Sequence, residues 1–101
     1  MDLQQILKQA QGMSSKLGEV QSALRERVVD AAAGGGLVTA YVNGDQQLVK
    51  IEIDPKAVDP DDPGLLEDLV VAAVNKALGE MKELIQAELT KAAGGRRPGL
   101  I

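Results

Sequence analysis

Residues 34–55, GGGLVTAYVNGDQQLVKIEIDP, decide the fold of this chain. On both sides of Asn43-Gly44, apolar side chains alternate with other side chains at a period of two, which is typical of half-buried β-strands. We expect strands over residues 36–43 and 47–54, joined at Asn43-Gly44-Asp45, because Asn, Gly and Asp favour tight turns. The stretch therefore predicts an antiparallel hairpin with one apolar face and one mostly polar face.

A third strand is expected immediately before this hairpin, over residues 27–33. Gly34-Gly35-Gly36 joins it to the next strand, since glycine adopts the backbone conformations that tight turns need. A glycine-rich stretch also invites comparison with phosphate-binding loops. Such a loop continues into Gly-Lys-Ser/Thr and a helix, whereas Leu37 and Val38 follow here and lead into a strand. We therefore interpret the triple glycine as a turn within a three-stranded antiparallel meander.

Residues 2–26 predict one long helix before the sheet. Apolar residues recur there in alternating steps of three and four, which form the a/d seam of a heptad repeat. The seam is narrow and the opposite face is polar, so the helix needs a partner along the seam. The seam consists of Leu3, Ile6, Ala10, Met13, Leu17, Val20 and Leu24.

A second long helix is expected over residues 64–91. Asp61 or Asp62 is placed to cap its beginning, with Pro63 in the first turn. A broad apolar stripe follows the helix and is wider in the first half than in the second. Such a stripe predicts a helix with one buried side.

The two helices are too long for the sheet alone to cover. The helix over residues 64–91 would extend about 40 Å, whereas a strand of six or seven residues covers about 20 Å. A second copy of the chain is the simplest partner for the apolar helical surface that remains, so a homodimer is expected. The residues expected to pack in the core or the dimer interface are Leu17, Val20, Leu24, Val74, Leu78 and Met81.

The predicted fold is α+β, of order α-β-β-β-α, with a three-stranded antiparallel sheet and two long projecting helices. A length of 101 residues provides for one domain. We expect residues 1–93 to form this single domain. Gly94-Gly95 ends the second helix, and residues 94–101 are expected to form a flexible C-terminal tail.

The composition excludes several classes of function. The chain contains no Cys and no His, and Tyr41 is its only aromatic residue. Zinc fingers, thiol nucleophiles, disulfides and Ser-His-Asp triads are therefore excluded. No apolar run approaches the ~20 residues of a membrane span, and the N-terminus lacks the basic and apolar regions of a signal peptide. We expect an intracellular, non-enzymatic protein without catalytic residues, metal, cofactor, small-molecule substrate or membrane partner.

Charge is unevenly distributed along the chain, whose net charge is −4. Residues 54–68 carry six acidic residues against Lys56 alone, a net charge of −5, while the remainder carries nine acidic and ten basic residues, a net charge of +1. An EF-hand calcium loop needs alternating acids, a central Gly and a terminal Glu. Pro63 interrupts such a pattern, so we interpret these acids as helix caps and solvated loop residues. The uneven charge permits a polyanionic partner without predicting one.

Taken together, these motifs resemble the YbaB/EbfC family of bacterial nucleoid-associated DNA-binding proteins. The matching stretches follow one another through nearly the whole chain: LKQAQ at 7–11, GGGLVTAYVNG at 34–44, VKIEIDP at 49–55, LLEDLVVAAVNKAL at 65–78 and Pro98-Gly99. The resemblance implies a tweezer-like homodimer with a sheet-based body and helical prongs. It also implies binding to double-stranded DNA with limited sequence preference, in the cytoplasm at the nucleoid. The implied role is to organise or compact the chromosome and to influence gene expression.

The resemblance attributes DNA contact to the prongs and so points to lysines on both helices. From spacing alone, the same lysines are expected to be ordinary solvated side chains, since those on the first helix lie off the apolar seam. Two arginines in the tail are better candidates, because guanidinium groups on a flexible segment suit phosphate oxygens. The candidate DNA-binding residues are therefore Lys8, Lys16, Lys82 and Lys91 from the resemblance, and Arg96 and Arg97 from the tail itself.

A second hypothesis remains open from the sequence: a dimeric protein-interaction clamp with little intrinsic affinity for DNA. The net acidic charge of the chain keeps this alternative in place. Charge at the prong tips separates the two hypotheses, because basic tips favour DNA, whereas apolar or acidic tips favour a protein partner.

Overall fold

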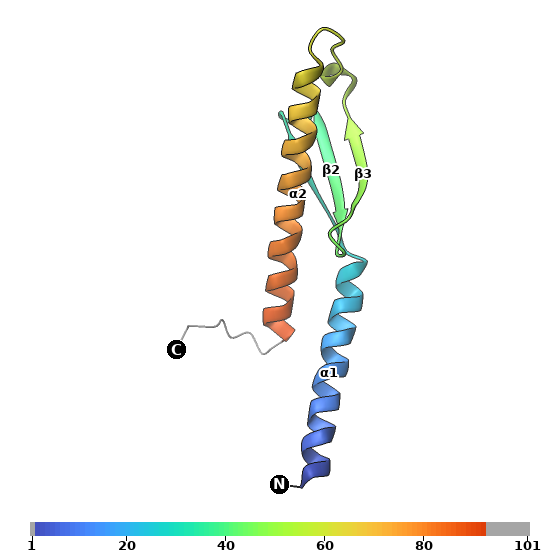
Figure 1. The fold of residues 1–101 in the computed structure, drawn as a ribbon, viewed down its shortest axis with the longest axis vertical. Helices are drawn as coiled ribbons and strands as arrows, with labels where there is room; N and C mark the ends of the chain where they lie inside the picture. Colours follow the sequence, from blue (N-terminus) through green and yellow to red (C-terminus); the bar gives the residue numbers. More distant parts are fainter. Residues whose placement is uncertain (1, 93–101) are drawn as a thin grey trace, which may run out of the picture.

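The computed structural model describes residues 2–92, apart from the side chains of residues 9–17. A helix, three strands and a second helix follow one another along the chain (Figure 1). This order confirms the predicted α+β fold of order α-β-β-β-α. The elements are α1 (Leu3–Arg25), β1 (Val28–Ala33), β2 (Val38–Asn43), β3 (Leu48–Ile53), a short 3₁₀ turn η1 (Pro55–Ala57) and α2 (Pro63–Ala92).

The three strands form one antiparallel sheet in the order β1-β2-β3, as predicted. Ala40 of the central strand pairs with Ala31 of β1 and with Ile51 of β3. The register shifts between Tyr41 and Val42, so that Val42 pairs with Leu48. A shift of this kind bends the strand and increases its twist. The bend lies close to the turn that connects β2 to β3.

Both turns are longer than the sequence predicted, so β2 and β3 begin one or two residues later. Gly34-Gly35-Gly36 has φ values of 64°, 69° and 98°, which favour glycine, and β2 starts at Val38. In the second turn Gln46 has a φ of 60°. The side chain of Asn43 stabilises this turn, because its Oδ1 atom accepts hydrogen bonds from the backbone N–H groups of Asp45 (3.0 Å) and Gln47 (3.1 Å).

Small side chains form much of the core between the sheet and α2. Alternate residues of β2 (Val38, Ala40 and Val42) are fully buried, since a strand directs every second side chain to the same face. Ala73 and Ala77 of α2 are also fully buried. Alanine at the contact lets the helix backbone approach the sheet closely. The fully buried core also includes Met81 and Ala57 of η1.

The molecule is elongated because α1 projects away from the sheet (Figure 1). Its extents are 72 × 29 × 15 Å and its radius of gyration is 19.7 Å, against about 13 Å for a compact domain of 100 residues. Only the last turns of α1 lie beside α2, which itself extends past the end of the sheet. The prediction of projecting helices is therefore confirmed.

The beginning of α2 confirms the predicted acidic cap and identifies it as Asp62. The Oδ1 atom of Asp62 accepts a hydrogen bond of 3.3 Å from the backbone N–H of Leu65, in the first turn of the helix. Asp61 plays a different part, since its own backbone N–H donates to Oδ1 of Asp59 (2.9 Å). Pro63 is the first residue of α2, where its missing N–H costs nothing.

Candidate nucleic-acid interface

The predicted DNA-binding lysines that the structure describes are all exposed, but they lie on different parts of the molecule. Lys8 belongs to the projecting part of α1, whereas Lys82 and Lys91 lie in the second half of α2. Nine residues separate Lys82 from Lys91, so they point to opposite sides of that helix, at about 100° per residue. The structure therefore brings no pair of these lysines together on one face of α2.

Three further predicted residues are only partly covered by the structure or not covered. Lys16 lies in α1, about 12 Å along the helix axis from Lys8 at 1.5 Å per residue, and its side chain is outside the described residues. Arg96 and Arg97 lie outside the described residues altogether. Their roles stay predictions.

The described lysines are available to a polyanion. Within residues 2–92, Lys8 and Lys82 form no ion pair. Lys91 Nζ lies 3.9 Å from Oε1 of Glu88, and the Lys91 side chain is 76% exposed. An exposed ion pair of this length contributes little stability, so a phosphate group can replace the carboxylate at little cost.

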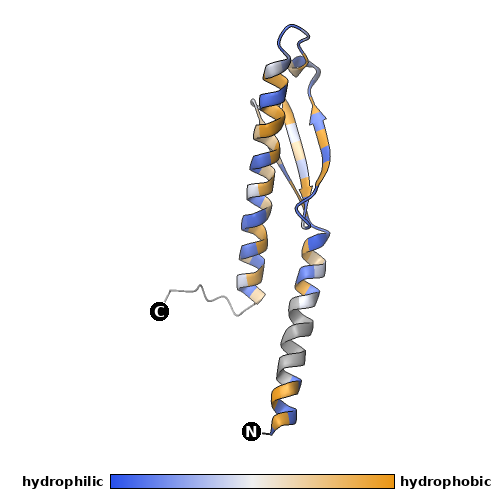
Figure 2. Ribbon diagram, viewed as in Figure 1, coloured by the Kyte–Doolittle hydropathy of each residue, from blue (hydrophilic) through white to orange (hydrophobic). Residues whose placement is uncertain are grey.

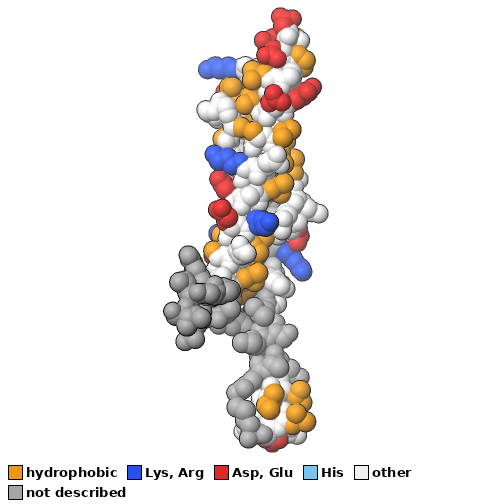
Figure 3. Space-filling view, turned by 60° about the vertical axis from the view of Figure 1, so that its left-hand side comes forward, with side chains coloured by type: hydrophobic (Ala, Val, Ile, Leu, Met, Phe, Trp, Pro, Cys, Tyr) orange, Lys and Arg blue, Asp and Glu red, His pale blue; other side chains and the backbone are white. Residues whose placement is uncertain are grey.

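Acidic side chains gather at the end of the molecule opposite the start of α1. The loop after β3 and the first turns of α2 form this acidic end, which is red at the top of Figure 3. Its residues 54–68 carry the net charge of −5, whereas residues 2–27 carry four basic and three acidic residues, a net charge of +1. The long axis of 72 Å thus separates the acidic end from the projecting part of α1.

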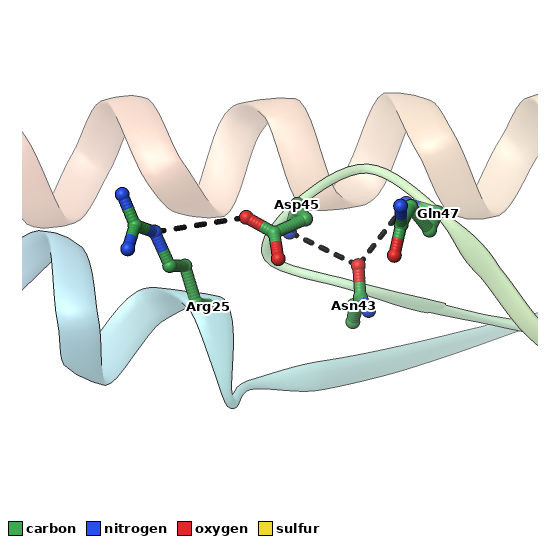
Figure 4. Close-up of polar contacts among 4 residues, drawn as sticks. All are labelled: Arg25, Asn43, Asp45 and Gln47. Carbon is green, nitrogen blue, oxygen red and sulfur yellow. Dashed lines mark hydrogen bonds and ion pairs between the residues drawn. The ribbon is translucent and has the colours of Figure 1, made fainter.

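Sequence reasoning did not single out the two arginines at the end of α1. Arg25 and Arg27 are both exposed. The Nε atom of Arg25 lies 3.7 Å from Oδ1 of Asp45, in the turn between β2 and β3 (Figure 4). The sequence feature that could have identified them is the run Arg25-Glu26-Arg27, which contains two basic residues. The structure places this run where α1 meets the sheet.

The sheet face that α2 leaves uncovered carries a small polar network rather than a basic surface. Tyr41 donates a hydrogen bond from its hydroxyl to Oε1 of Glu52 (3.1 Å), and Lys50 Nζ lies 2.8 Å from the same oxygen. Lys50 also lies over the Tyr41 ring, 5.3 Å from its centre. Lys50 is already paired with Glu52, and Asp30 adds negative charge to the same face. This face of the sheet is therefore a poor binding surface for phosphate.

The residues predicted to pack in the core or the dimer interface show a graded burial. Met81 is fully buried and Leu24 is 6% exposed. Val20, Val74 and Leu78 are half-buried. The side chain of Leu17 lies outside the described residues. Half-buried apolar residues on two helices leave apolar surface for a further contact.

Apolar side chains are exposed at the tip of α1. Leu3, Ile6 and Leu7 are 69%, 47% and 53% exposed, and the start of α1 carries hydrophobic colour in the ribbon of Figure 2. A monomer leaves this part of the heptad seam without a partner. The described tip, residues 2–8, is thus apolar, with one acidic and one basic residue, Asp2 and Lys8.

The described residues also bear on metal binding and on membrane insertion. Within residues 2–92, no group of three or more acidic side chains is arranged to hold a metal ion. No helix in this part of the chain is both long and apolar enough to cross a membrane.

The order of elements, the single sheet and the long projecting helix define an elongated two-layer α+β protein. The crystal structure of an uncharacterised protein from Helicobacter pylori, HP0035, has the same fold, with a TM-score of 0.78 over 93% of this chain and 99% of that chain. The two sequences are 21% identical, so this comparison concerns the fold alone.

The sequence model of the YbaB/EbfC DNA-binding family matches residues 1–96, and the chain belongs to this family. A nucleoid-associated protein of Thermoanaerobacter pseudethanolicus is 47% identical over 100 residues, which cover 98% of this chain and 90% of that protein. A nucleoid-associated protein of Saccharopolyspora erythraea is 50% identical over 97 residues, covering 93% and 84%. The resemblance noted from the motifs is thereby confirmed.

Proposed function

We propose that the chain acts as a homodimeric nucleoid-associated protein that binds double-stranded DNA with low sequence specificity. The proposal places it at the nucleoid in the bacterial cytoplasm, where it helps organise or compact the chromosome and influences gene expression. Family membership and the names of the relatives support DNA as the partner. No catalytic activity is part of this proposal.

One observation carries the proposal: a projecting helix bears Lys8 at the end of the molecule opposite the acidic end formed by residues 54–68. The dimer would have a formal charge of −8, so long-range repulsion opposes its approach to DNA. Separation by most of a 72-Å axis far exceeds the Debye length, which is about 8 Å at physiological salt. Phosphates near α1 would therefore feel the local lysines and little of the acidic end.

Exposed apolar residues support the homodimer. Leu3 and Ile6 begin the seam that ends at the buried Leu24, and Leu7 lies beside it. The seam residues between Ile6 and Leu24 keep the alternating steps of four and three. A second copy covers such a seam without any new chemistry, because the same surface serves both chains. The polar side of each α1 helix would then stay exposed. The heptad pattern of the sequence assigns Lys8 and Lys16 to this polar side.

Low specificity follows from the side chains on the prongs. The proposed contacts are Lys8, Lys16, Lys82, Lys91, Arg96 and Arg97, which suit phosphate oxygens. Reading bases in the major groove needs an array of Arg, Asn or Gln side chains held in one geometry. The described lysines point in different directions and form no such array.

A mobility-shift experiment tests this function. Wild type is compared with Lys8→Glu/Lys16→Glu on duplexes of different sequence, at about 50 mM and about 150 mM salt. We expect the double variant to lose about tenfold or more in affinity for every duplex at low salt, because up to four phosphate contacts per dimer are lost. For wild type, log affinity should fall with log salt at a slope of about −2 to −5.

Lys56→Glu/Lys76→Glu is the matched control. Both of these lysines are exposed, and neither lies on α1. The double substitution changes the net charge by the same amount as Lys8→Glu/Lys16→Glu. Equal losses in the two variants would show that net charge matters and that the prong assignment is wrong.

The apolar tip of α1 favours a second candidate, the protein-interaction clamp. Leu3, Ile6 and Leu7 are exposed in the same turns of α1 as the single described tip lysine, and apolar tips suit a protein partner. If wild type shows no shift with any duplex at low salt, this hypothesis replaces the DNA-binding one.

A further inference from the structure

The turn between β2 and β3 touches the backbone of the last turn of α1. A Cβ atom built on Gly44 would overlap the carbonyl group of Leu24 and would lie 2.7 Å from the Cα atom of Arg25. All of these are backbone atoms, so no side-chain rotation relieves the overlap. Glycine at position 44 is therefore what allows the turn and α1 to lie in contact.

Turn conformation does not explain this glycine. Within residues 2–92, the glycines with positive φ are Gly34, Gly35 and Gly36, and Gly44 is not among them. The one residue of the second turn with a positive φ is Gln46. The φ of Gly44 lies outside the left-handed region that favours glycine, so the absence of a side chain serves the contact with α1.

Besides this backbone contact, the junction contains the buried side chain of Leu24 and polar contacts at the surface. Arg25 Nε lies 3.7 Å from Asp45 Oδ1, and both side chains are more than half exposed (Figure 4). Asn43 holds the turn in shape through two hydrogen bonds. A cavity of about 230 Å³ opens beside Gly44, between Leu24 of α1 and Ile85 of α2. The end of α1 is thus held by the close backbone contact at Gly44 together with the buried side chain of Leu24.

We infer that Gly44 is a positioning residue for α1: its contact with Leu24 sets the direction in which this helix projects from the body. The 23 residues of α1 rise about 34 Å, so a rotation of about 10° at the junction would move the tip by about 6 Å. That displacement approaches two base-pair rises of DNA. The consequence for DNA contact by Lys8 rests on the proposed function, whereas the direction of α1 does not.

Spin-label distances test the direction of α1 without DNA. The chain has no Cys, so the exposed residues Gln5 of α1 and Gln86 of α2 can be replaced by Cys and labelled. An excess of unlabelled chain ensures that a dimer contains one labelled copy. We expect Gly44→Ala to shift the mean distance by about 3–8 Å or to broaden its distribution, because the tip lies about 30 Å from the junction.

Gly18→Ala and Gly79→Ala are matched controls, since a Cβ atom at either position meets nothing within 4 Å. Their distance distributions should equal that of the wild type. If Gly44→Ala does not fold, Asn43→Ala provides the second variant, because it loosens the turn without adding atoms. A folded Gly44→Ala or Asn43→Ala protein with an unchanged distance distribution overturns the inference.

DNA binding by the same variants separates the two proposals. We expect Gly44→Ala to bind duplex DNA about three- to tenfold more weakly than Gly18→Ala, with a flatter salt dependence, because fewer lysines reach phosphates at once. Shifted distances with unchanged affinity overturn the positioning role for DNA contact. Wild type that binds no DNA overturns the proposed function, and the distances then still decide whether Gly44 sets the direction of α1.

Discussion

Lys50 Nζ lies 2.8 Å from the Oε1 atom of Glu52, two residues along β3 on the face of the sheet that α2 leaves uncovered. Hydrogen bonds from Lys50 and then from Tyr41 hold the pKa of the Glu52 carboxyl below its usual value. The same hydrogen bond to Glu52 raises the pKa of Lys50, and the bond between Tyr41 and Glu52 raises the pKa of the Tyr41 hydroxyl. The three shifts tie this network to the pH dependence of stability.

The lowered pKa of Glu52 predicts a small loss of stability in acid. A carboxyl with a lower pKa in the folded state stabilises the fold above its unfolded pKa of about 4.3. That contribution is lost as the pH falls through the folded pKa. Urea unfolding of wild type and Glu52→Gln at neutral and acidic pH checks this: the difference between them should shrink in acid. A difference that is constant with pH would contradict it.

The raised pKa values of Lys50 and Tyr41 give the opposite sign at high pH. Each group binds its proton more tightly in the folded state, so its contribution is present below the unfolded pKa and lost as the pH rises through the folded one. We expect the advantage of wild type over Lys50→Met to decline above about pH 10. Since the network is exposed, salt should reduce the effect at every pH.

A larger side chain at position 77 is expected to destabilise the contact between α2 and the sheet. Its side chain is fully buried, so Ala77→Leu should lower the free energy of unfolding by about 1–3 kcal/mol. Ala72 lies on the exposed side of the same helix, and Ala72→Leu should change stability by less than about 0.5 kcal/mol. Urea unfolding of both variants measures the difference. Equal effects would mean that α2 does not pack on the sheet through Ala77.

The capping hydrogen bond of Asp62 is expected to stabilise the start of α2. Asp62→Ala removes the acceptor for the Leu65 N–H and should lower the free energy of unfolding by about 1 kcal/mol. Asp61→Ala removes the same charge from the same loop but not this hydrogen bond, so it should be nearly neutral. Both variants remove one negative charge from the acidic end, so the difference between their stabilities does not contain the effect of reduced charge repulsion. Thermal unfolding in which Asp61→Ala is the less stable variant would contradict the assignment.

The homodimer predicts that stability depends on protein concentration. If the folded chain exists as a dimer, the midpoint of unfolding rises with concentration, because association stabilises the folded state by mass action. Light scattering at micromolar concentration should give about twice the chain mass of 10.6 kDa. Leu17→Asp or Leu78→Asp should weaken folding and dimerisation together, since an unpaired buried charge is costly. A folded monomer whose unfolding midpoint is independent of concentration would refute the dimer.

Local patterns predicted most of the secondary structure. A period of two in residues 38–42 and a period near 3.6 in both helices reflect which side of each element is buried, and this pattern is written in every residue of the element. Turn positions were also predictable from Gly34-Gly35-Gly36 and Asn43. Turn lengths were not predictable, because Gln46 adopts a positive φ in the second turn and glutamine has no preference for such a conformation.

The candidate interface was predicted less completely than the fold. Exposure of Lys8, Lys82 and Lys91 follows from their positions off the apolar stripes. Their distribution over separate faces and elements does not follow, because it depends on how the helices are set against the sheet. The excess of acidic residues in 54–68 could be counted from the sequence. The distance between this segment and the start of α1, along a 72-Å axis, is known only from the structure, because it depends on how α1 projects.

By itself, the sequence determined the order of the elements and the apolar face of each, since both depend on residues near one another in the chain. Its composition alone excluded cysteine and histidine chemistry. Only the tertiary structure decided what Gly44 is for. Sequence reasoning assigned it to a turn, yet its neighbours are Leu24 and Arg25, some twenty residues earlier. A close approach between two backbones leaves no periodic pattern in either segment, because it is a property of the distance between them.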